Sequence, residues 1–248
     1  MCEEENHRRE HREEHREEHR EEHGEEDREI LHLHQNVLAK NNQAAEKNRA
    51  LFCNLLVINL MSSPGAGKTT LIQQFLRQTP FRTAVVVGDL ATDCDAQMIR
   101  QVGTPAIQIT TGNLCHLDAE SVANAAKNLE LEMLDLLIIE NVGNLVCPAM
   151  YHLGEDLRIV LMSVTEGENK PLKYPTLFKS ADAVVISKSD LAEAVGFDRK
   201  KAMAYLSQVV PQTPIFDVSA RLGHGIEAFQ AYLAQALREK RPLPSLST

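Results

Sequence analysis

The sequence contains no tryptophan, and aromatic residues make up only 4% of its 248 positions. It also lacks an apolar run long enough to cross a bilayer, which takes about 20 residues. The longest run near the start covers residues 55–61 and is interrupted by Asn59. The first residues are charged and have no signal-peptide core. We therefore expect a cytoplasmic protein that does not contact a membrane.

The sequence has few cysteines, and their count is odd. The five residues are Cys2, Cys53, Cys94, Cys115 and Cys147. An odd count with wide spacing in a chain of this size argues against a disulfide framework. The thiols are therefore expected to be reduced and available as metal ligands.

An excess of positive charge is also missing, since the net charge is −9. Residues 1–29 hold 14 of the 35 acidic and 6 of the 26 basic side chains, so the remaining residues are nearly neutral. Nucleic-acid binding depends on a basic surface that neutralises phosphates. We therefore expect no nucleic-acid partner.

What the first 29 residues do contain is histidine at every fourth position. The five histidines of this register are His7, His11, His15, His19 and His23. On a helix, residues four apart share one face, so neighbouring imidazoles could hold one divalent ion, and a disordered tail would still chelate loosely. We interpret residues 1–29 as a low-complexity metal-binding tail. The alternative is a solvated charged tail.

The rest of the chain is predicted to form a leader helix and one α/β domain. Residues 30–53 lack proline and glycine and predict the helix, whereas residues 54–248 alternate apolar runs with helical patterns, as in a mainly parallel sheet. The predicted strands are 55–60, 84–87, 106–109, 134–139, 159–164, 183–187 and 215–218. The predicted helices are 68–77, 93–102, 118–129, 174–180, 199–208 and 225–239.

A phosphate-binding loop follows the first predicted strand. Residues 62–69 read SSPGAGKT, which fits the G-x-x-x-x-G-K-[ST] pattern except that Ser62 replaces the first glycine. Such a loop turns its N–H groups toward phosphate, while Lys68 reaches the β- and γ-phosphates and Thr69 binds magnesium. The alternative is a glycine-rich turn. The predicted contacts are Ser63, Gly65, Ala66, Gly67, Lys68, Thr69 and Thr70.

Two later segments point to guanine as the base. Residues 187–190 read SKSD after an apolar strand and resemble the N-K-x-D motif of GTPases, with Ser187 in place of asparagine. The carboxylate of Asp190 would accept two hydrogen bonds that guanine offers and adenine does not, and Lys188 would pack along the base. Ser219 and Ala220 begin a loop similar to the S-A-K loop at guanine O6. An ordinary polar loop is the alternative for SKSD.

Two carboxylates end predicted strands near the phosphate loop. Glu140 stands where GTPases commonly have the aspartate of D-x-x-G, and Asp89 ends the second strand. We predict that both serve magnesium or position water, so the catalytic candidates are Lys68, Asp89 and Glu140. Helix capping or a loop role is the alternative for each carboxylate. No residue stands out as a strong general base, so slow, switch-like turnover is expected.

Cys115-His116 and Cys147 form a candidate metal site. A thiolate beside an imidazole suits zinc or nickel, but adjacent residues cannot close a tetrahedral site alone. Two copies of the chain meeting across a two-fold axis could supply enough ligands. The alternative makes Cys147 a small buried apolar residue and His116 a capping residue.

Taken together, these segments resemble the HypB family of nickel-insertion GTPases. The resemblance rests on residues 59–70, 88–95, 111–118, 140–148 and 165–175 and covers roughly residues 30–241. It implies a P-loop fold of the SIMIBI type, GTP hydrolysis with Mg²⁺, and a GTP-dependent homodimer that binds nickel or zinc at the subunit interface. It also implies partners that include the large subunit of [NiFe]-hydrogenase and other nickel-maturation accessory proteins. The histidine tail, a separate signal, is expected to sequester or store nickel.

The sequence departs from the family in two places and leaves other functions open. Ser187 replaces a frequent asparagine, and only Cys2 stands where some members carry C-x-x-C-G-C. A nickel-storage protein with a weak nucleotide site, a urease-type accessory GTPase and an ATP-dependent kinase of similar fold are the alternatives.

Overall fold

The computed structural model describes residues 32–33 and 35–241. The described residues fall into two units, with the division between residues 40 and 41. Residues 32–33 and 35–40 of the first unit are helical, and so are residues 41–51 of the second. These stretches overlap the leader helix predicted for 30–53, although the division falls inside that range. The histidines of the predicted tail, residues 1–29, lie outside the described residues.

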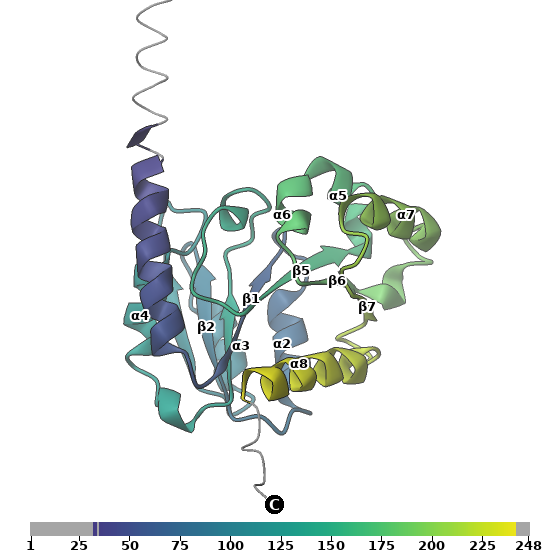
Figure 1. Ribbon diagram of the computed structural model, residues 1–248. Helices are drawn as coiled ribbons and strands as arrows, with labels where there is room; N and C mark the ends of the chain where they lie inside the picture. Colours follow the sequence, from purple (N-terminus) through teal and green to yellow (C-terminus); the bar gives the residue numbers. More distant parts are fainter. Residues whose placement is uncertain (1–31, 34, 242–248) are drawn as a thin grey trace, which may run out of the picture. The chain divides into compact units, whose positions relative to one another are not determined.

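Within residues 41–241, seven parallel strands form one sheet in the order β3-β2-β4-β1-β5-β6-β7 (Figure 1). The strands are β1 (Leu56–Met61), β2 (Thr83–Asp89), β3 (Ala106–Thr110), β4 (Leu136–Glu140), β5 (Leu157–Ser163), β6 (Ala183–Ser187) and β7 (Ile215–Val218). The α/β fold with a parallel sheet, predicted from the sequence, is confirmed. Strand β4 begins two residues later than predicted because Leu134 still closes the preceding 3₁₀ turn, where its N–H bonds to Leu131 O at 3.1 Å.

Helices flank this sheet. They are α2 (Lys68–Leu76), α3 (Cys94–Arg100), α4 (Ala119–Ala126), α5 (Lys170–Lys173), α6 (Pro175–Lys179), α7 (Arg199–Val209) and α8 (Ile226–Lys240). Short 3₁₀ turns are η1 (Leu131–Met133), η2 (Cys147–Ala149), η3 (Val164–Glu166) and η4 (Ser189–Leu191). The four-residue helix α5 was not predicted, because one turn is too short to display helical periodicity. Among the helices of the described residues, none combines the length and hydropathy needed to cross a membrane.

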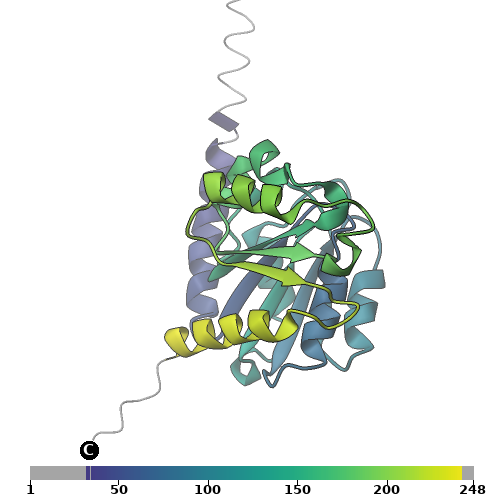
Figure 2. The same cartoon turned by 90° about the vertical axis from the view of Figure 1, so that its right-hand side faces the viewer.

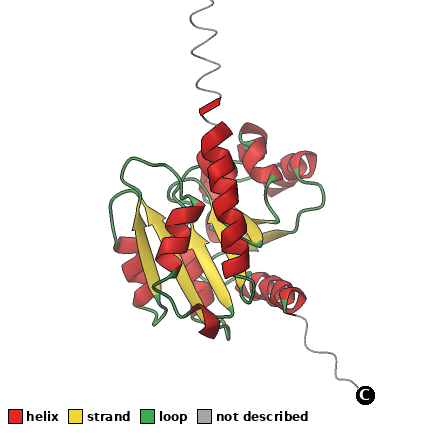
Figure 3. Cartoon of the chain, turned by 60° about the vertical axis from the view of Figure 1, so that its left-hand side comes forward, coloured by secondary structure: helices red, strands yellow, loops and turns green. Residues whose placement is uncertain are grey.

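The apolar strands are covered on both faces, as expected for a parallel sheet. Along β1, Leu56, Ile58 and Leu60 pack in a core with α2, α3 and α8, whereas Val57 belongs to a second core with α4. A third core lies on the same face of the sheet as Val57, where β5 and β6 pack against α6 and α7. Figure 2 shows α7 and α8 on opposite sides of the strands, and Figure 3 shows the strands between the helices.

Hydrogen bonds from buried asparagines hold residues 41–51 against the loop before β5. Asn48 Nδ2 donates to Leu153 O at 2.8 Å and to Ala119 O at 2.7 Å, and Asn41 Nδ2 donates to His152 O at 2.8 Å. Gly154 has φ +92°, and a Cβ there would lie 2.4 Å from Asn48 Cβ. Only glycine permits this approach, which fixes the loop that runs from η2 to β5.

The carboxyl ends of β1, β2 and β4 meet at one edge of the sheet. Glu140, the last residue of β4, is in register with Leu60 of β1 and with Val87 of β2. The phosphate loop follows β1, and Asp89 ends β2. Ligands of open α/β sheets bind outside the carboxyl ends of the strands, so the sheet order itself gathers the candidate residues.

Candidate nucleotide and metal site

The phosphate loop lies between β1 and α2 with two glycines in left-handed conformations. Gly65 has φ +72° and Gly67, the N-cap of α2, has φ +96°. The side chain of Lys68 is buried and its Nζ donates to Ser62 Oγ at 3.1 Å. Burial lowers the pKa of Lys68, against the opposing influence of Glu140 and other nearby carboxylates. An ammonium held in this way is poised for an anionic ligand.

Glu140 lies beside the loop with one oxygen unsatisfied. Its side chain is 3% exposed. Oε1 accepts a hydrogen bond from Thr69 Oγ1 at 2.7 Å, whereas Oε2 is buried without a partner among the described residues. Burial is the main reason why the pKa of Glu140 is raised to about 7. A hydroxyl and an orphaned carboxylate oxygen fit the oxygen ligands that Mg²⁺ prefers.

Asp89 faces the same space, although its Oδ1 already accepts hydrogen bonds within its own loop. The donors are Thr92 N at 2.8 Å and Ala91 N at 3.0 Å. Partial burial raises the pKa of Asp89, but these bonds outweigh it and leave the pKa lowered. Asp95, in the first turn of α3, lines the pocket as well. No role was predicted for Asp95, although it lies in the segment 88–95 that carries the family resemblance, six residues after Asp89.

The candidate nucleotide contacts surround two adjoining pockets that share Gly67, Thr70 and Lys188. The phosphate pocket is also lined by Gly65, Lys68, Thr69, Asp89, Asp95, Glu140 and Gly143. The base pocket is also lined by Ala66, Ser187, Asp190, Leu191, Ala220 and Arg221. Ser63 and Ser219 line neither pocket. Ser63 Oγ instead donates to Glu166 Oε1.

Polar contacts join the base pocket to the phosphate loop. Ser187 Oγ donates to Ala66 O at 2.7 Å, so the residue that departs from the GTPase motif still ties β6 to the loop. Lys188 has φ +57°, and its Nζ donates to Gly65 O at 2.7 Å. Asp190 Oδ1 accepts a hydrogen bond from Ser219 Oγ at 2.6 Å, which orients the carboxylate along the pocket wall.

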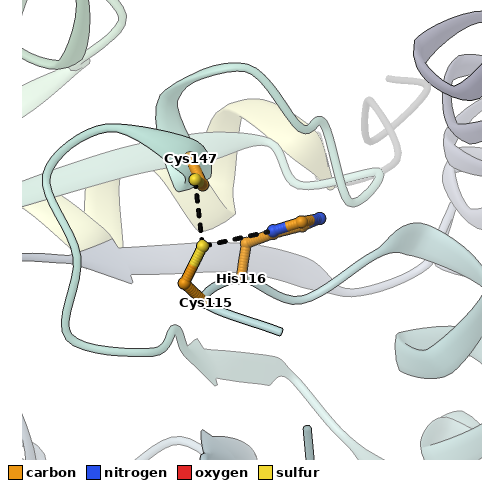
Figure 4. A group of neighbouring side chains, drawn as sticks. All are labelled: Cys115, His116 and Cys147. Carbon is orange, nitrogen blue, oxygen red and sulfur yellow. Dashed lines mark hydrogen bonds between the residues drawn. The ribbon is translucent and has the colours of Figure 1, made fainter. Parts of the chain in front are cut away.

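Cys115, His116 and Cys147 come together in space. Their ligand atoms all lie within 4.8 Å of one another (Figure 4). Cys115 Sγ is 3.0 Å from Cys147 Sγ and 4.0 Å from His116 Nδ1. Two sulfurs and one imidazole nitrogen fit a soft divalent ion and leave one coordination position open. We call these three residues the metal group.

The surroundings adjust the protonation of the metal group. The His116 ring stacks on Tyr151 with centroids 3.8 Å apart, and partial burial lowers the pKa of His116. A lowered pKa favours the neutral imidazole that metals bind. The pKa of the Cys147 thiol is raised by its hydrogen bond with Cys115 and by partial burial, so metal binding there would release a proton.

One loop touches both sites. It leaves β4 at Glu140 and reaches Cys147 at the start of η2. On the way, Gly143 packs so tightly on the phosphate loop that a Cβ would lie 2.8 Å from Pro64 Cα. Asn144 Nδ2 then donates to Cys115 O at 3.1 Å. We call residues 140–147 the linking loop, because it runs from Glu140 in the phosphate pocket to Cys147 of the metal group.

The fold and the phosphate loop define a P-loop nucleotide-binding protein, and residues 56–217 match the family described as CobW/HypB/UreG, nucleotide-binding domain. The hydrogenase maturation factor HypB of Escherichia coli K12 is 47% identical over 210 residues, which are 83% of this chain and 72% of that protein. The hydrogenase/urease maturation factor HypB of Helicobacter pylori 26695 is 46% identical over 211 residues, 83% and 87% of the two chains. The chain belongs to the HypB family of hydrogenase maturation factors.

A solved structure supports the same assignment. The crystal structure of HypB from Helicobacter pylori in complex with nickel matches with a TM-score of 0.78 and 44% identity. The match covers 81% of this chain and 96% of that one. The resemblance to HypB inferred from the sequence is therefore confirmed.

Proposed function

We propose that this chain hydrolyses GTP and uses the nucleotide to control the delivery of nickel to a [NiFe]-hydrogenase. The observation that carries the proposal is the linking loop, which begins beside Thr69 and ends in a ligand of the metal group. The names of the relatives support the delivery role, since they are hydrogenase maturation factors and one was solved with nickel.

The base pocket favours GTP over ATP. Asp190 is an acceptor for the N1–H and amino group of guanine, while Lys188 covers the base. Ser219 holds Asp190 in place, and Ala220 lines the wall where the carbonyl O6 would meet backbone N–H groups. Adenine presents an acceptor and no amino group at the edge facing Asp190, so it would leave the carboxylate unpaired at a cost.

The chain's contribution to hydrolysis is charge placement. Lys68 supplies a buried positive charge for the phosphates, and Thr69 and Glu140 are the groups that would hold Mg²⁺. The cation, when bound, neutralises phosphate charge. Asp89 and Asp95 face the same pocket and can orient water. Since none of these carboxylates is a dedicated strong base, we expect turnover of the order of a switch, below about 1 per second.

Nickel is the cargo of the metal group, and zinc is a competing ion because the same thiolate and imidazole donors suit both. One chain supplies three ligands. A GTP-dependent homodimer would bring two metal groups together across a two-fold axis and complete the coordination. A reducing compartment such as the cytoplasm would keep Cys115 and Cys147 as thiols.

The recipient in this proposal is the large subunit of a hydrogenase, reached with other nickel-maturation accessory proteins. A urease-type recipient is the alternative, since one relative is named for both hydrogenase and urease maturation. The histidines of residues 1–29 would store nickel and supply it to the metal group.

The deciding experiment measures nickel affinity and sedimentation of the full chain with GDP and with a non-hydrolysable GTP analogue. We expect the two nucleotides to give different nickel affinities and the analogue to favour the dimer. Identical affinity and identical association state with both nucleotides would refute the proposal.

Deleting residues 1–29 separates nickel delivery from nickel storage. If the chain is a switch, the truncated protein keeps its GTPase activity and dimerisation while losing part of its nickel capacity. If it is a storage protein with a weak nucleotide site, nearly all nickel binding is lost and the remaining protein shows no nucleotide-dependent affinity.

A further inference from the structure

A row of buried polar side chains lies beneath the linking loop. Its members are Asn141, Asn59, Glu155 and Arg158, and each is at most 7% exposed. Buried polar groups are costly unless each is hydrogen-bonded, so such a row is retained only where its bonds are made. None of the nucleotide contacts or metal ligands predicted from the sequence belongs to it.

The row begins at the residue after Glu140. Asn141 Oδ1 accepts hydrogen bonds from Val142 N at 2.9 Å and from Leu117 N at 3.4 Å. Leu117 follows His116 in the chain. Asn141 therefore joins the start of the linking loop to the segment that carries two ligands of the metal group.

Asn59 continues the row. Its Oδ1 accepts a hydrogen bond from Asn141 Nδ2 at 3.2 Å, and its own Nδ2 donates to Glu155 Oε1 at 3.3 Å. Asn59 is in register with Arg158 on the neighbouring strand, so both side chains project from the same face of the sheet. Their backbones belong to the sheet, which gives the row a rigid base.

Arg158 ends the row with three hydrogen bonds in different directions. Its Nε donates to Glu155 Oε1 at 2.6 Å, and its terminal nitrogens donate to Ala149 O at 3.0 Å and Tyr151 O at 2.8 Å. Ala149 is the last residue of the turn η2, which Cys147 begins. A planar guanidinium spreads its donors over three nitrogens in a fixed fork, whereas an ammonium has all its donors on one nitrogen and cannot reach acceptors placed this way.

We propose that Asn59 and Arg158 are positioning residues that hold the metal group in register with the nucleotide site. Arg158 fixes the backbone that follows Cys147, including Tyr151, on which His116 stacks. Asn59 connects this fixed backbone to Asn141, beside Glu140. The inference rests on the proposed nucleotide control of nickel binding and names the side chains through which that control acts.

The first test compares nickel affinity in the GDP state and in the GTP-analogue state for the full chain and for Asn59→Ser. Asn59→Ser leaves every ligand and nucleotide contact in place but shortens the bridge. In Asn59→Ser we expect the ratio of the two nickel affinities to be at least about threefold closer to one than in the unaltered chain. The affinity for each nucleotide should stay the same.

The outcomes distinguish this inference from the function on which it rests. A ratio of one in the unaltered chain would refute the proposed function and this inference with it. A ratio above one that Asn59→Ser retains in full would overturn the inference and leave the proposed function standing.

A second variant covers the case in which Asn59→Ser does not fold. Arg158→Lys keeps the charge next to Glu155 but gives up the fork that reaches Ala149 and Tyr151. The control is Arg82→Lys, because Arg82 also pairs with a carboxylate, Asp135, but does so just before β2 and β4 and away from the buried row.

We expect Arg158→Lys to lower nickel affinity about tenfold and to change the thiolate-to-nickel absorption band, as outer-shell substitutions do. Arg82→Lys should leave the affinity and the band unchanged at a similar melting temperature. Unchanged nickel affinity and absorption in Arg158→Lys would overturn the proposal, and so would an equal loss in Arg82→Lys.

Discussion

Thr69 and Glu140 are joined by a 2.7 Å hydrogen bond from hydroxyl to carboxylate, although 71 residues separate them in the chain. The bond uses one carboxylate oxygen and leaves the other buried without a partner in the part of the chain that the structure describes. The pair thus connects the end of the phosphate loop to the first residue of the linking loop. A ligand that engages either group must affect both.

Replacing Glu140 by glutamine is expected to slow GTP hydrolysis by about a hundredfold or more, because charge placement at the phosphates is lost while the side chain keeps its shape. Single-turnover hydrolysis measures the effect. Glu132→Gln, at an exposed position, is the control and should be as active as the unaltered chain. Equal hydrolysis rates for the two variants would show that Glu140 has no role in hydrolysis.

Asp190→Asn is expected to weaken GTP binding by at least about a hundredfold and to improve binding of xanthosine triphosphate. The reason is polarity, since an amide can donate to the xanthine oxygen but cannot accept both guanine donors. Competition titrations against a fluorescent nucleotide measure it, with exposed Glu193→Gln as the control. If the unaltered chain binds ATP as tightly as GTP, the assignment of Asp190 is wrong.

Cys147→Ser should reduce nickel affinity by more than the roughly 10–100-fold loss typical of an outer-shell change, because it removes a ligand itself. GTP affinity should not change, since Cys147 does not line either nucleotide pocket. Equilibrium dialysis with metal analysis gives the affinity. Exposed Cys94→Ser is the matched control, and a loss of equal size there would contradict the assignment.

Asp135 provides a prediction for stability as a function of pH. Hydrogen bonds from Arg82 are the main reason why the pKa of Asp135 is lowered to about 2, and Arg241 adds a contact at 3.0 Å. The folded pKa lies below the unfolded value of about 3.9, so ionised Asp135 stabilises the fold above that pH and the benefit disappears as the pH falls toward 2.

Because the Arg82 side chain is 56% exposed, screening reduces the contribution of Asp135 to about 1 kcal/mol. Urea unfolding of Asp135→Asn and of the unaltered chain should therefore differ by about 1 kcal/mol at pH 7, and the difference should shrink below the unfolded pKa and vanish as the pH falls to about 2. A constant difference across this range would mean that the charge of Asp135 contributes nothing.

The sequence by itself determined the elements whose information is local. The apolar runs predicted all seven strands, and residues 62–69 predicted the phosphate loop because its glycines, Lys68 and Thr69 are contiguous. Where the prediction missed, the local signal was weak: α5 is a single turn, and Asp95 is an ordinary acidic residue at a helix start.

Only the tertiary structure decided which distant residues meet. Cys115 lies 3.0 Å from Cys147 because parallel β3 and β4 deliver their following loops to the same edge of the sheet. Asn59 and Arg158 share a face because β1 and β5 are neighbours in register. Strand order and register are set by the packing of the whole sheet between its helices, and no short stretch of sequence carries that information.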